Sequence, residues 1–332
     1  MKIKNAFSKV ALAISCLVIP FTSQAADVSI NLGYTGAKGS PYTVFADKFE
    51  ELAEKYTNGT VDIKVRCCGQ LVTEDEAFKA LQLGTVDMTI MAMNNISPHY
   101  PLMDIFVLPY IFQNKAHADK IVNGEVGKKF SEDFSQKTKV HLLAYGGFGY
   151  RDFYNSVRPV NSVEDMKGLK VRTPKNEVML ETFKAFGASP VPIAWADTPT
   201  ALQTGTVVGA DNGTSFIKSQ KFYEIADHLT VLNHFSYFTP LLASSRVMKK
   251  LSPEQTAAIQ KAASEASQHQ DAVIAKETEE VRTFLGKEGG MAVTRPDPSS
   301  FITAALTVQD KIAAKKSEAF RALLEEIRAE AK

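Results

Sequence analysis

The sequence lacks any large imbalance of charge. Its 332 residues include 38 lysines and arginines against 37 aspartates and glutamates, with neither a basic tail nor a polybasic run. The positive surface that binds the phosphate backbone of nucleic acids is therefore missing. After residue 25, no stretch approaches the roughly 20 consecutive apolar residues that span a bilayer as a helix. We therefore expect no nucleic-acid partner and no membrane-spanning segment in the mature chain.

Short motifs of several enzyme classes are also missing. The sequence contains no His-Glu-x-x-His, no Gly-x-Ser-x-Gly and no phosphate-binding Gly-x-x-x-x-Gly-Lys-[Ser/Thr]. Gly147-Phe148-Gly149 begins like a dinucleotide-binding loop, but Asp152 stands where the third glycine is needed. The six histidines are scattered, and a lone histidine is more often structural than a metal ligand. We expect no catalytic residue, no cofactor and no metal site.

Cysteine is scarce as well: there are three, and two of them, Cys67 and Cys68, are neighbours. A disulfide framework needs pairs that are spaced along the chain, so the sequence does not predict one. A bond between the two neighbours is the alternative, at a cost in strain. We expect instead that one of these cysteines packs inward and that the other ends a strand.

Residues 1–25 predict a signal peptide. Three lysines form a positive first segment, residues 10–21 form an apolar segment, and Ser23-Gln24-Ala25 fits the small-x-small cleavage pattern. A lipoprotein acylated at Cys16 is the alternative, but Ala13 stands where leucine is usual. The prediction is export to the periplasm.

Short β-type runs alternate with helical runs along the rest of the chain, which predicts an α/β fold with mainly parallel strands. The expected strands cover residues 28–34, 61–66, 86–93, 140–145, 169–172, 191–194 and 207–210. The expected helices cover residues 40–55, 73–83, 177–186, 198–203, 252–285 and 299–331. Ser40 followed by Pro41 marks one helix start, and the patterns Thr73-x-x-Glu76 and Ser252-x-x-Gln255 predict capping boxes at two others. The length predicts two lobes, and because no linker separates them, strands are expected to cross between the lobes.

Arginine and amide side chains stand where several expected strands end. They are Arg151, Arg172, Asn212, Asn94 and Asn95. Ligands of open α/β sheets bind beyond the carboxyl ends of the strands. The planar fork of an arginine binds a carboxylate through two parallel charge-assisted hydrogen bonds, which lysine cannot match. The pattern therefore indicates an anion site.

Each arginine also has a purely structural interpretation. Arg151 pairs, in that interpretation, with Asp152 or with a surface carboxylate. Arg172 pairs with Asp165 or Glu164. The sequence alone leaves both alternatives open.

Several long motifs, in order along nearly the whole mature chain, resemble the substrate-binding proteins of TRAP transporters, a family of periplasmic receptors typified by dicarboxylate- and sialate-binding members. The motifs are GQLVTEDEAFKALQLGTVDMTIM (69–91), FVLPYIF (106–112), GFGYRDFYNSVRPVNSVEDMKGLKVRTP (147–174), FGASPVPIAWADTPTALQTGTVVGADN (186–212) and QKFYEIADHLTVLNH (220–234). The resemblance implies a two-lobed periplasmic-binding-protein fold with strands crossing between the lobes and a long hinge-spanning helix. We assign residues 26–148 and 238–277 to lobe I, and residues 149–237 and 278–332 to lobe II.

The resemblance also implies roles for individual residues. Arg172 would be the main carboxylate clamp, Arg151 a second polar contact, Asn212 an amide contact and Trp195 an aromatic that stacks on the ligand. For Trp195 the alternative is ordinary packing between the lobes. Further candidates lie in the matching cleft loops: Glu74, Asn94, Asn95 and Phe148.

The sequence departs from the family pattern in three places, one of which is Cys67-Cys68 in a segment that is commonly aromatic or contains proline. Val208 stands where an acidic residue is usual, and Asn212-Gly213 replaces Asn-Pro. These differences leave the ligand open among dicarboxylates, sugar acids, keto acids and aromatic acids, which share a carboxylate.

The function implied is capture of a small organic carboxylate in an interlobe cleft and its delivery to the membrane subunits of a TRAP transporter. One alternative is a ligand-binding partner of a signalling receptor. The other is an enzyme that processes a carboxylate.

Overall fold

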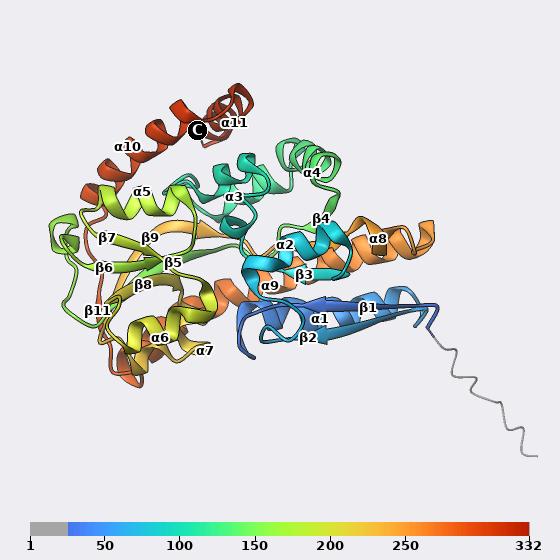
Figure 1. Cartoon of the computed structure of the whole chain (residues 1–332), viewed down its shortest axis with the longest axis horizontal. Coiled ribbons are helices and arrows are strands. Elements are labelled where there is room, and N and C mark those ends of the chain that lie inside the picture. Colours follow the sequence, from blue (N-terminus) through green and yellow to red (C-terminus); the bar gives the residue numbers. More distant parts are fainter. Residues whose placement is uncertain (1–25, 332) are drawn as a thin grey trace, which may run out of the picture.

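The computed structural model describes residues 26–331, so the predicted signal peptide with Cys16 lies outside the described residues. Two mixed sheets form two lobes (Figure 1). The sheet of lobe I has the order β2-β1-β3-β10-β4, and its strands are β1 (Val28–Gly33), β2 (Val61–Arg66), β3 (Met88–Ile90), β4 (Val140–Ala144) and β10 (Leu241–Ser244). The sheet of lobe II has the order β11-β9-β5-β8-β6-β7, and its strands are β5 (Gly149–Asn155), β6 (Lys170–Thr173), β7 (Ser189–Pro192), β8 (Gly209–Gly213), β9 (His228–Tyr237) and β11 (Ala292–Thr294).

Helices cover the faces of both sheets (Figure 1). They are α1 (Pro41–Tyr56), α2 (Glu74–Leu83), α3 (Lys115–Val122), α4 (Glu125–Thr138), α5 (Glu177–Ala185), α6 (Thr198–Gln203), α7 (Thr214–Ser219), α8 (Ser245–Met248), α9 (Pro253–Lys287), α10 (Ser299–Lys315) and α11 (Glu318–Glu330). Within residues 26–331, none of them has the length and apolarity that a membrane crossing requires.

Three connections join the lobes within the described chain. Residues 145–148 lead from β4 to β5, residues 238–240 lead from β9 to β10, and α9 runs from one lobe to the other. The two-lobed α/β fold is therefore confirmed, but the chain crosses between the lobes in short non-strand links that join strands of the two sheets. The expectation of mainly parallel strands was too simple, because β5 and β10 each run antiparallel to both neighbours. Each of these strands directly follows an interlobe crossing.

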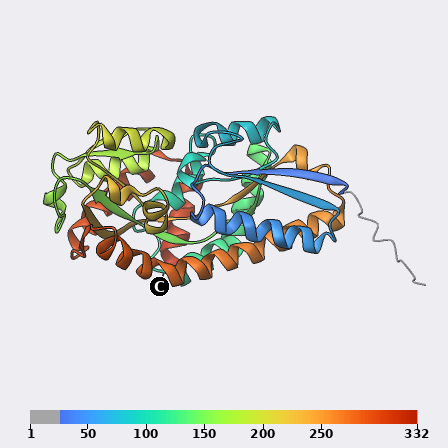
Figure 2. The ribbon, with the colours of Figure 1, turned by 90° about the horizontal axis from the view of Figure 1, so that it is seen from below.

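Helix α9 is the long element that belongs to both lobes. Its 35 residues span ~52 Å at about 1.5 Å per residue. It runs beside α1 along the underside of the molecule (Figure 2). Its first half buries alanines and Ile259 in the core of lobe I, whereas Val281 and Leu285 near its end lie in the core of lobe II. The capping box predicted at its start is confirmed, because Ser252 and Gln255 each accept the other's backbone N–H.

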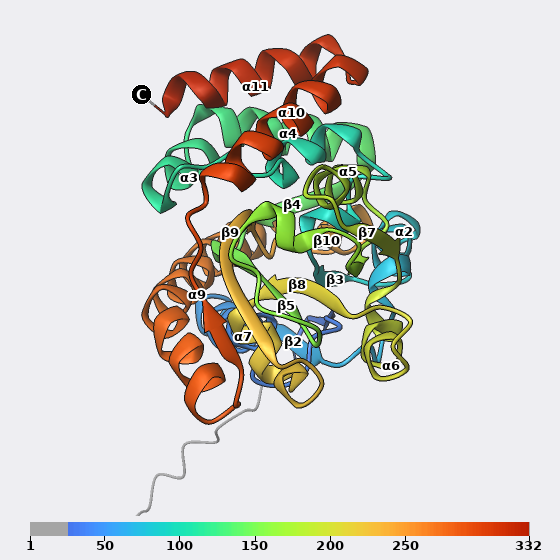
Figure 3. The same cartoon turned by 90° about the vertical axis from the view of Figure 1, so that its left-hand side faces the viewer.

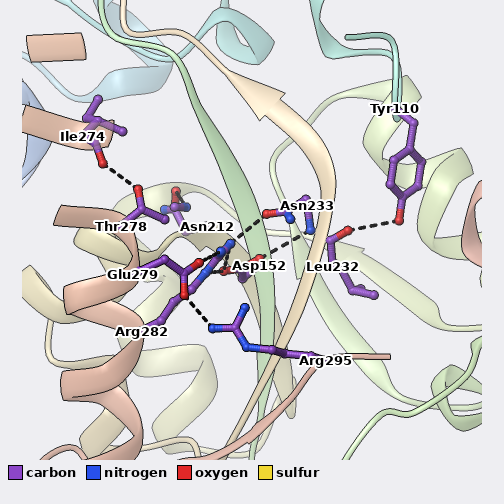
Figure 4. Close-up of polar contacts among 11 residues, drawn as sticks. Tyr110, Asp152, Asn212, Leu232, Asn233, Ile274, Thr278, Glu279, Arg282 and Arg295 are labelled. Atoms are coloured by element: carbon purple, nitrogen blue, oxygen red, sulfur yellow. Dashed lines mark hydrogen bonds and ion pairs between the residues drawn. The ribbon is translucent and has the colours of Figure 1, made fainter. Parts of the chain in front are cut away.

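A buried ion pair fixes the second half of α9 to lobe II (Figure 4). Arg282 lies 2.7 Å from Asp152 of β5, and its guanidinium also donates to Asn233 of β9 at 2.7 Å. Glu279, one turn earlier on α9, accepts from Arg282 and from Arg295 beyond β11. Arg282 and Asp152 are both buried. The helix end and the central strands of lobe II therefore form one polar network.

Several predicted elements need correction. The expected helix over residues 299–331 is two helices, because Lys316 is extended and Ser317 caps a new helix through Phe320 N. Figure 3 shows α10 and α11 passing over α3, α4 and α5, and α11 contacts α3 in the range assigned to lobe I. The lobe boundaries themselves remain a prediction.

The strand expected over residues 86–93 is shorter, because the chain leaves β3 and forms a 3-10 turn at Met93–Asn95. The strand expected at residues 191–194 lies at 189–192 instead, and the one expected at 207–210 lies at 209–213. The capping box predicted at Thr73 is wrong, because the Thr73 hydroxyl donates to the Glu76 carboxylate instead of accepting a backbone N–H.

The expectation of two separate cysteines is also wrong, because Cys67 and Cys68 are joined by a disulfide. The pair directly follows β2. Cys68 and Gly69 both have positive φ, 62° and 76°, so the chain turns sharply here. The turn leads into α2, whose first residue is Glu74.

Candidate functional site

A pocket opens between the lobes and encloses about 460 Å³, its mouth included. Lobe I, lobe II and the second crossing all contribute to its lining: Tyr42, Glu74, Ala92, Asn94, Asn95, Arg151, Arg172, Pro174, Trp195, Asn212, Phe216, Tyr237, Phe238 and Thr239. Seven of the eight predicted site residues are among them. The eighth, Phe148, is buried against Phe112, Tyr150 and Phe238 behind the lining. We therefore no longer expect Phe148 to touch a ligand.

Arg172 is a buried guanidinium without an acidic partner among residues 26–331. Its side chain comes from β6 and is 3% exposed. Nε donates to the backbone oxygen of Ile193 at 3.0 Å, and no described residue accepts from either terminal nitrogen. Burial lowers the pKa of Arg172 to about 10, and nearby Arg151 acts in the same direction, so the group stays charged at neutral pH. A buried charge without a partner costs several kcal/mol, so this position favours an anion.

The pairing considered for Arg172 with Asp165 or Glu164 does not occur. Asp165 accepts the backbone N–H groups of Asn161 and Ser162, and it caps the 3-10 turn at Val163–Met166. Its carboxylate is therefore engaged locally.

Arg151 differs from Arg172 because it has a buried acidic partner. Its Nε lies 2.6 Å from Asp211 Oδ2, and Nη2 donates to the Asp211 backbone oxygen at 2.6 Å. The partner is neither Asp152, which pairs with Arg282, nor a surface residue. The register of β5 and β8 explains the contact: Arg151 pairs with Gly213 and Phe153 with Asp211, so Arg151 and Asp211 are diagonal neighbours on one face.

The Arg151–Asp211 pair is electrostatically satisfied. Burial alone would raise the pKa of Asp211, but Arg151 and His234 hold it below its usual value. Nε2 of His234 lies 3.4 Å from Asp211 Oδ2. Burial opposes the charge of Arg151, yet Asp211 raises the pKa of Arg151 overall. Arg151 thus brings hydrogen-bond donors to the pocket while its charge is balanced.

Asn212 is held so that its amide nitrogen remains available. Its Oδ1 accepts from Arg151 Nη1 at 3.2 Å and from the backbone N–H of Gly213 at 2.8 Å. No described residue accepts from its Nδ2. Asn94 and Asn95 reach the pocket from the 3-10 turn after β3, where Asn94 Nδ2 donates to Asn95 Oδ1 at 2.7 Å.

Trp195 lies beneath the Arg172 guanidinium, whose central carbon is 5.6 Å from the ring centre. Its ring also meets Phe222 edge-on at 5.8 Å. Trp195 therefore packs within lobe II and also lines the cavity, and its stacking on a ligand stays a prediction.

Glu74 is the acidic residue of the lining. It is 7% exposed and accepts three hydrogen bonds, from the Thr35 hydroxyl at 2.7 Å, the Tyr42 hydroxyl at 3.1 Å and the backbone N–H of Ala92 at 2.9 Å. A second, wider hollow borders the pocket at Glu74 and Trp195 and includes Cys68. We call it the outer hollow.

Sequence reasoning missed several residues of the site. Tyr237 ends β9, a strand that was not predicted, and Asp211 matters only through the register of β5 and β8. Tyr42 carried a usable signal, because it stands next to Pro41 at the start of the first helix, after a strand. No group of three or more His, Cys, Asp or Glu side chains in residues 26–331 is arranged to hold a metal ion.

Comparisons with known proteins agree with this architecture. The sequence profile of the bacterial extracellular solute-binding proteins, family 7, matches residues 32–316. The 2,3-diketo-L-gulonate-binding periplasmic protein YiaO of Escherichia coli is 30% identical over 296 residues, covering 89% of each chain. The C4-dicarboxylate-binding periplasmic protein DctP of Rhodobacter capsulatus is 32% identical over 275 residues, covering 82% of each chain.

Among solved structures, a TRAP periplasmic solute-binding protein from Polaromonas sp. bound to D-erythronate superposes with a TM-score of 0.86. It is 31% identical, and the match covers 91% of this chain and 98% of that chain.

Proposed function

Because this chain belongs to family 7 of the bacterial extracellular solute-binding proteins, the solute receptors of TRAP transporters, we propose that Arg172 captures the carboxylate of a small organic acid in the interlobe pocket. The receptor then delivers its solute to the membrane subunits of a TRAP transporter. The observation that carries the assignment of Arg172 is its buried guanidinium, which has no acidic partner among the described residues.

A carboxylate is the anion that fits this environment best. Its two oxygens match the fork of a guanidinium, which binds them through parallel charge-assisted hydrogen bonds. Arg151 and Asn212 lie in the same lining. The charge of Arg151 is balanced by Asp211 and the Asn212 amide nitrogen is neutral, so both offer hydrogen-bond donors without adding net charge. The solutes named for YiaO, DctP and the Polaromonas protein all carry a carboxylate, which supports the proposal.

Capture and release require the lobes to move apart and together. Three connections between two lobes favour a hinge motion. Closure excludes water, so the attraction between Arg172 and the anion grows in the lower effective dielectric. We propose further site residues beside Arg172: Arg151, Asn212 and Trp195 as direct contacts, and Glu74, Asn94 and Asn95 as contacts that depend on the ligand.

We also propose that the protein acts in the periplasm and is not an enzyme. The predicted signal peptide and the name of the family support export. Membership of a family of solute receptors supports the absence of enzymatic activity, and the lining contains no serine, cysteine, histidine or lysine among the described residues. A partnership with a signalling receptor would use the same pocket.

A thermal-shift screen tests the proposal. The mature protein is heated with sugar acids, dicarboxylates, keto acids and aromatic acids, and with neutral sugars of matched size as controls. A cleft ligand stabilises the folded state by about 2.7 kcal/mol at 100 times its dissociation constant. We expect at least one carboxylate to raise the midpoint and to be recovered unchanged. Stabilisation by neutral sugars alone, or turnover of the bound acid, would contradict the proposal.

A further inference from the structure

Glu74 and Arg172 place opposite charges in one pocket, one from each lobe. Glu74 is the first residue of α2 and lines both the pocket and the outer hollow. No lysine, arginine or histidine of the described chain lies within ion-pair distance of its carboxylate, and its three partners are two hydroxyls and one backbone N–H. Its negative charge is therefore not cancelled by contact with a cation.

The hydrogen bonds of Glu74 leave room for one more donor. An ionised carboxylate accepts about four hydrogen bonds, two on each oxygen. Oε1 takes two, from Tyr42 and from Ala92 N, whereas Oε2 takes one, from Thr35. Burial raises the pKa of Tyr42 well above its usual value, and the nearby charge of Glu74 raises it further. The Tyr42 hydroxyl therefore stays protonated and donates. Oε2 can therefore accept one more hydrogen bond, which a ligand hydroxyl supplies and an ionised carboxylate cannot.

The charges of the lining also limit the charge of the ligand. Arg151 is balanced by Asp211, so Arg172 and Glu74 carry the unbalanced charges, one positive and one negative. When a monoanion binds Arg172, the charges of Arg172, Glu74 and the ligand add up to about −1. A dianion would bring a second buried carboxylate with no further cation to meet it, and like charges in a site of low dielectric repel strongly.

We propose that Glu74 sets the substrate class of this receptor, which is a hydroxylated monocarboxylate: the carboxylate meets Arg172, a hydroxyl donates to Glu74, and a second carboxylate is rejected. The inference rests on the proposed function and adds specificity to it. Rejection of the wrong partner through repulsion is a general route to specificity. The amides of Asn94, Asn95 and Asn212 offer further partners for ligand hydroxyls.

Matched pairs of acids test the inference by titration calorimetry. D-erythronate and succinate both have four carbons, and D-glucuronate and D-glucarate both have six; within each pair only the second acid has two carboxylates. We expect the wild-type protein to bind the monocarboxylate of a pair at least tenfold more tightly. In E74Q this preference shrinks at least tenfold, because the amide is uncharged and can donate to a carboxylate.

Glu76→Gln is the matched control. Glu76 lies in the same first turn of α2, is exposed and is outside the lining, so E76Q removes the same charge without touching the site. We expect E76Q to keep the wild-type preference. If E74Q does not fold, as judged by circular dichroism, the wild-type comparison decides alone.

The outcomes separate the inference from the proposed function. The role of Glu74 is overturned if the dicarboxylate of either pair binds as tightly as the monocarboxylate or more tightly, or if folded E74Q keeps the wild-type preference. The proposed receptor function stands in both cases. If none of the four acids binds, the inference is tested by the acids that raise the midpoint in the thermal-shift screen. It is overturned if all of those acids are dicarboxylates or lack a hydroxyl group. Failure of every carboxylate to bind folded protein overturns the proposed function itself.

Discussion

The Oε1 atom of Gln270 accepts the backbone N–H of Gly147 at 2.6 Å, which joins α9 to the first interlobe crossing. The same oxygen accepts the Thr239 hydroxyl from the second crossing at 3.0 Å, and Nε2 donates to the backbone oxygen of Pro41 at 2.7 Å. One fully buried side chain thus binds all three connections between the lobes and the start of α1. A Cβ at Gly147 would lie 2.9 Å from the Gln270 side chain, so this close approach requires glycine.

Gln270→Ala is expected to destabilise the protein by about 2–4 kcal/mol, because it leaves several buried polar groups without partners at about 1–3 kcal/mol each. Urea unfolding measures the change. Gln268→Ala, an exposed neighbour on the same helix, serves as the control and is expected to stay near wild type. A Gln270→Ala variant as stable as Gln268→Ala would mean that the crossings are held by other contacts.

Arg172→Ala is expected to weaken binding of the native acid by roughly 30- to 4,000-fold, since removal of one side of a buried charge pair costs about 2–5 kcal/mol. Arg172→Lys is also expected to bind poorly, because the two-pronged geometry is lost. Titration calorimetry measures both variants. Lys170→Ala removes the same charge from an exposed position on the same strand and keeps the affinity. Near-wild-type affinity in Arg172→Ala would show that the clamp lies elsewhere.

Trp195 is the single tryptophan of the chain, so tryptophan fluorescence reports on the pocket alone. We expect ligand to change the emission of the wild-type protein, because the ring lies against Arg172. The same concentrations should leave the emission of Arg172→Ala unchanged. Trp195→Phe loses the signal and, by calorimetry, still binds within about tenfold. A ligand that binds by calorimetry without any change in emission would place it away from Trp195.

Asp211→Asn is expected to destabilise the protein by about 3–5 kcal/mol at neutral pH, because it leaves the buried Arg151 without its partner. The pKa of Asp211 is lowered in the folded state, so its stabilisation is present above its unfolded value near pH 3.8 and is lost as pH falls below it. The stability gap between wild type and Asp211→Asn should therefore narrow in acid. Urea unfolding between pH 3 and pH 7 measures it. A gap that widens as pH falls would contradict the pairing.

Local signals predicted much of the fold. The helix that follows Ser40 and Pro41, strand β2 and the capped start of α9 are placed as expected, because each depends on residues a few positions apart. The short strands β10 and β11 were missed, since pairing with distant partners defines them more than their own periodicity does. The break between α10 and α11 was missed because one extended residue, Lys316, leaves the helical pattern on both sides nearly intact.

The sequence by itself determined the α/β receptor family, its two lobes, its long helix and the identity of the arginines, because motifs and caps are encoded in neighbouring residues. Only the tertiary structure decided that Asp211 balances the charge of Arg151 while Arg172 has no acidic partner among the described residues. It also decided that Glu74 and Arg172 line the same pocket. Asp211 is 60 residues from Arg151 along the chain. Strand register and the meeting of two lobes bring such charges together, and neither is encoded at short range.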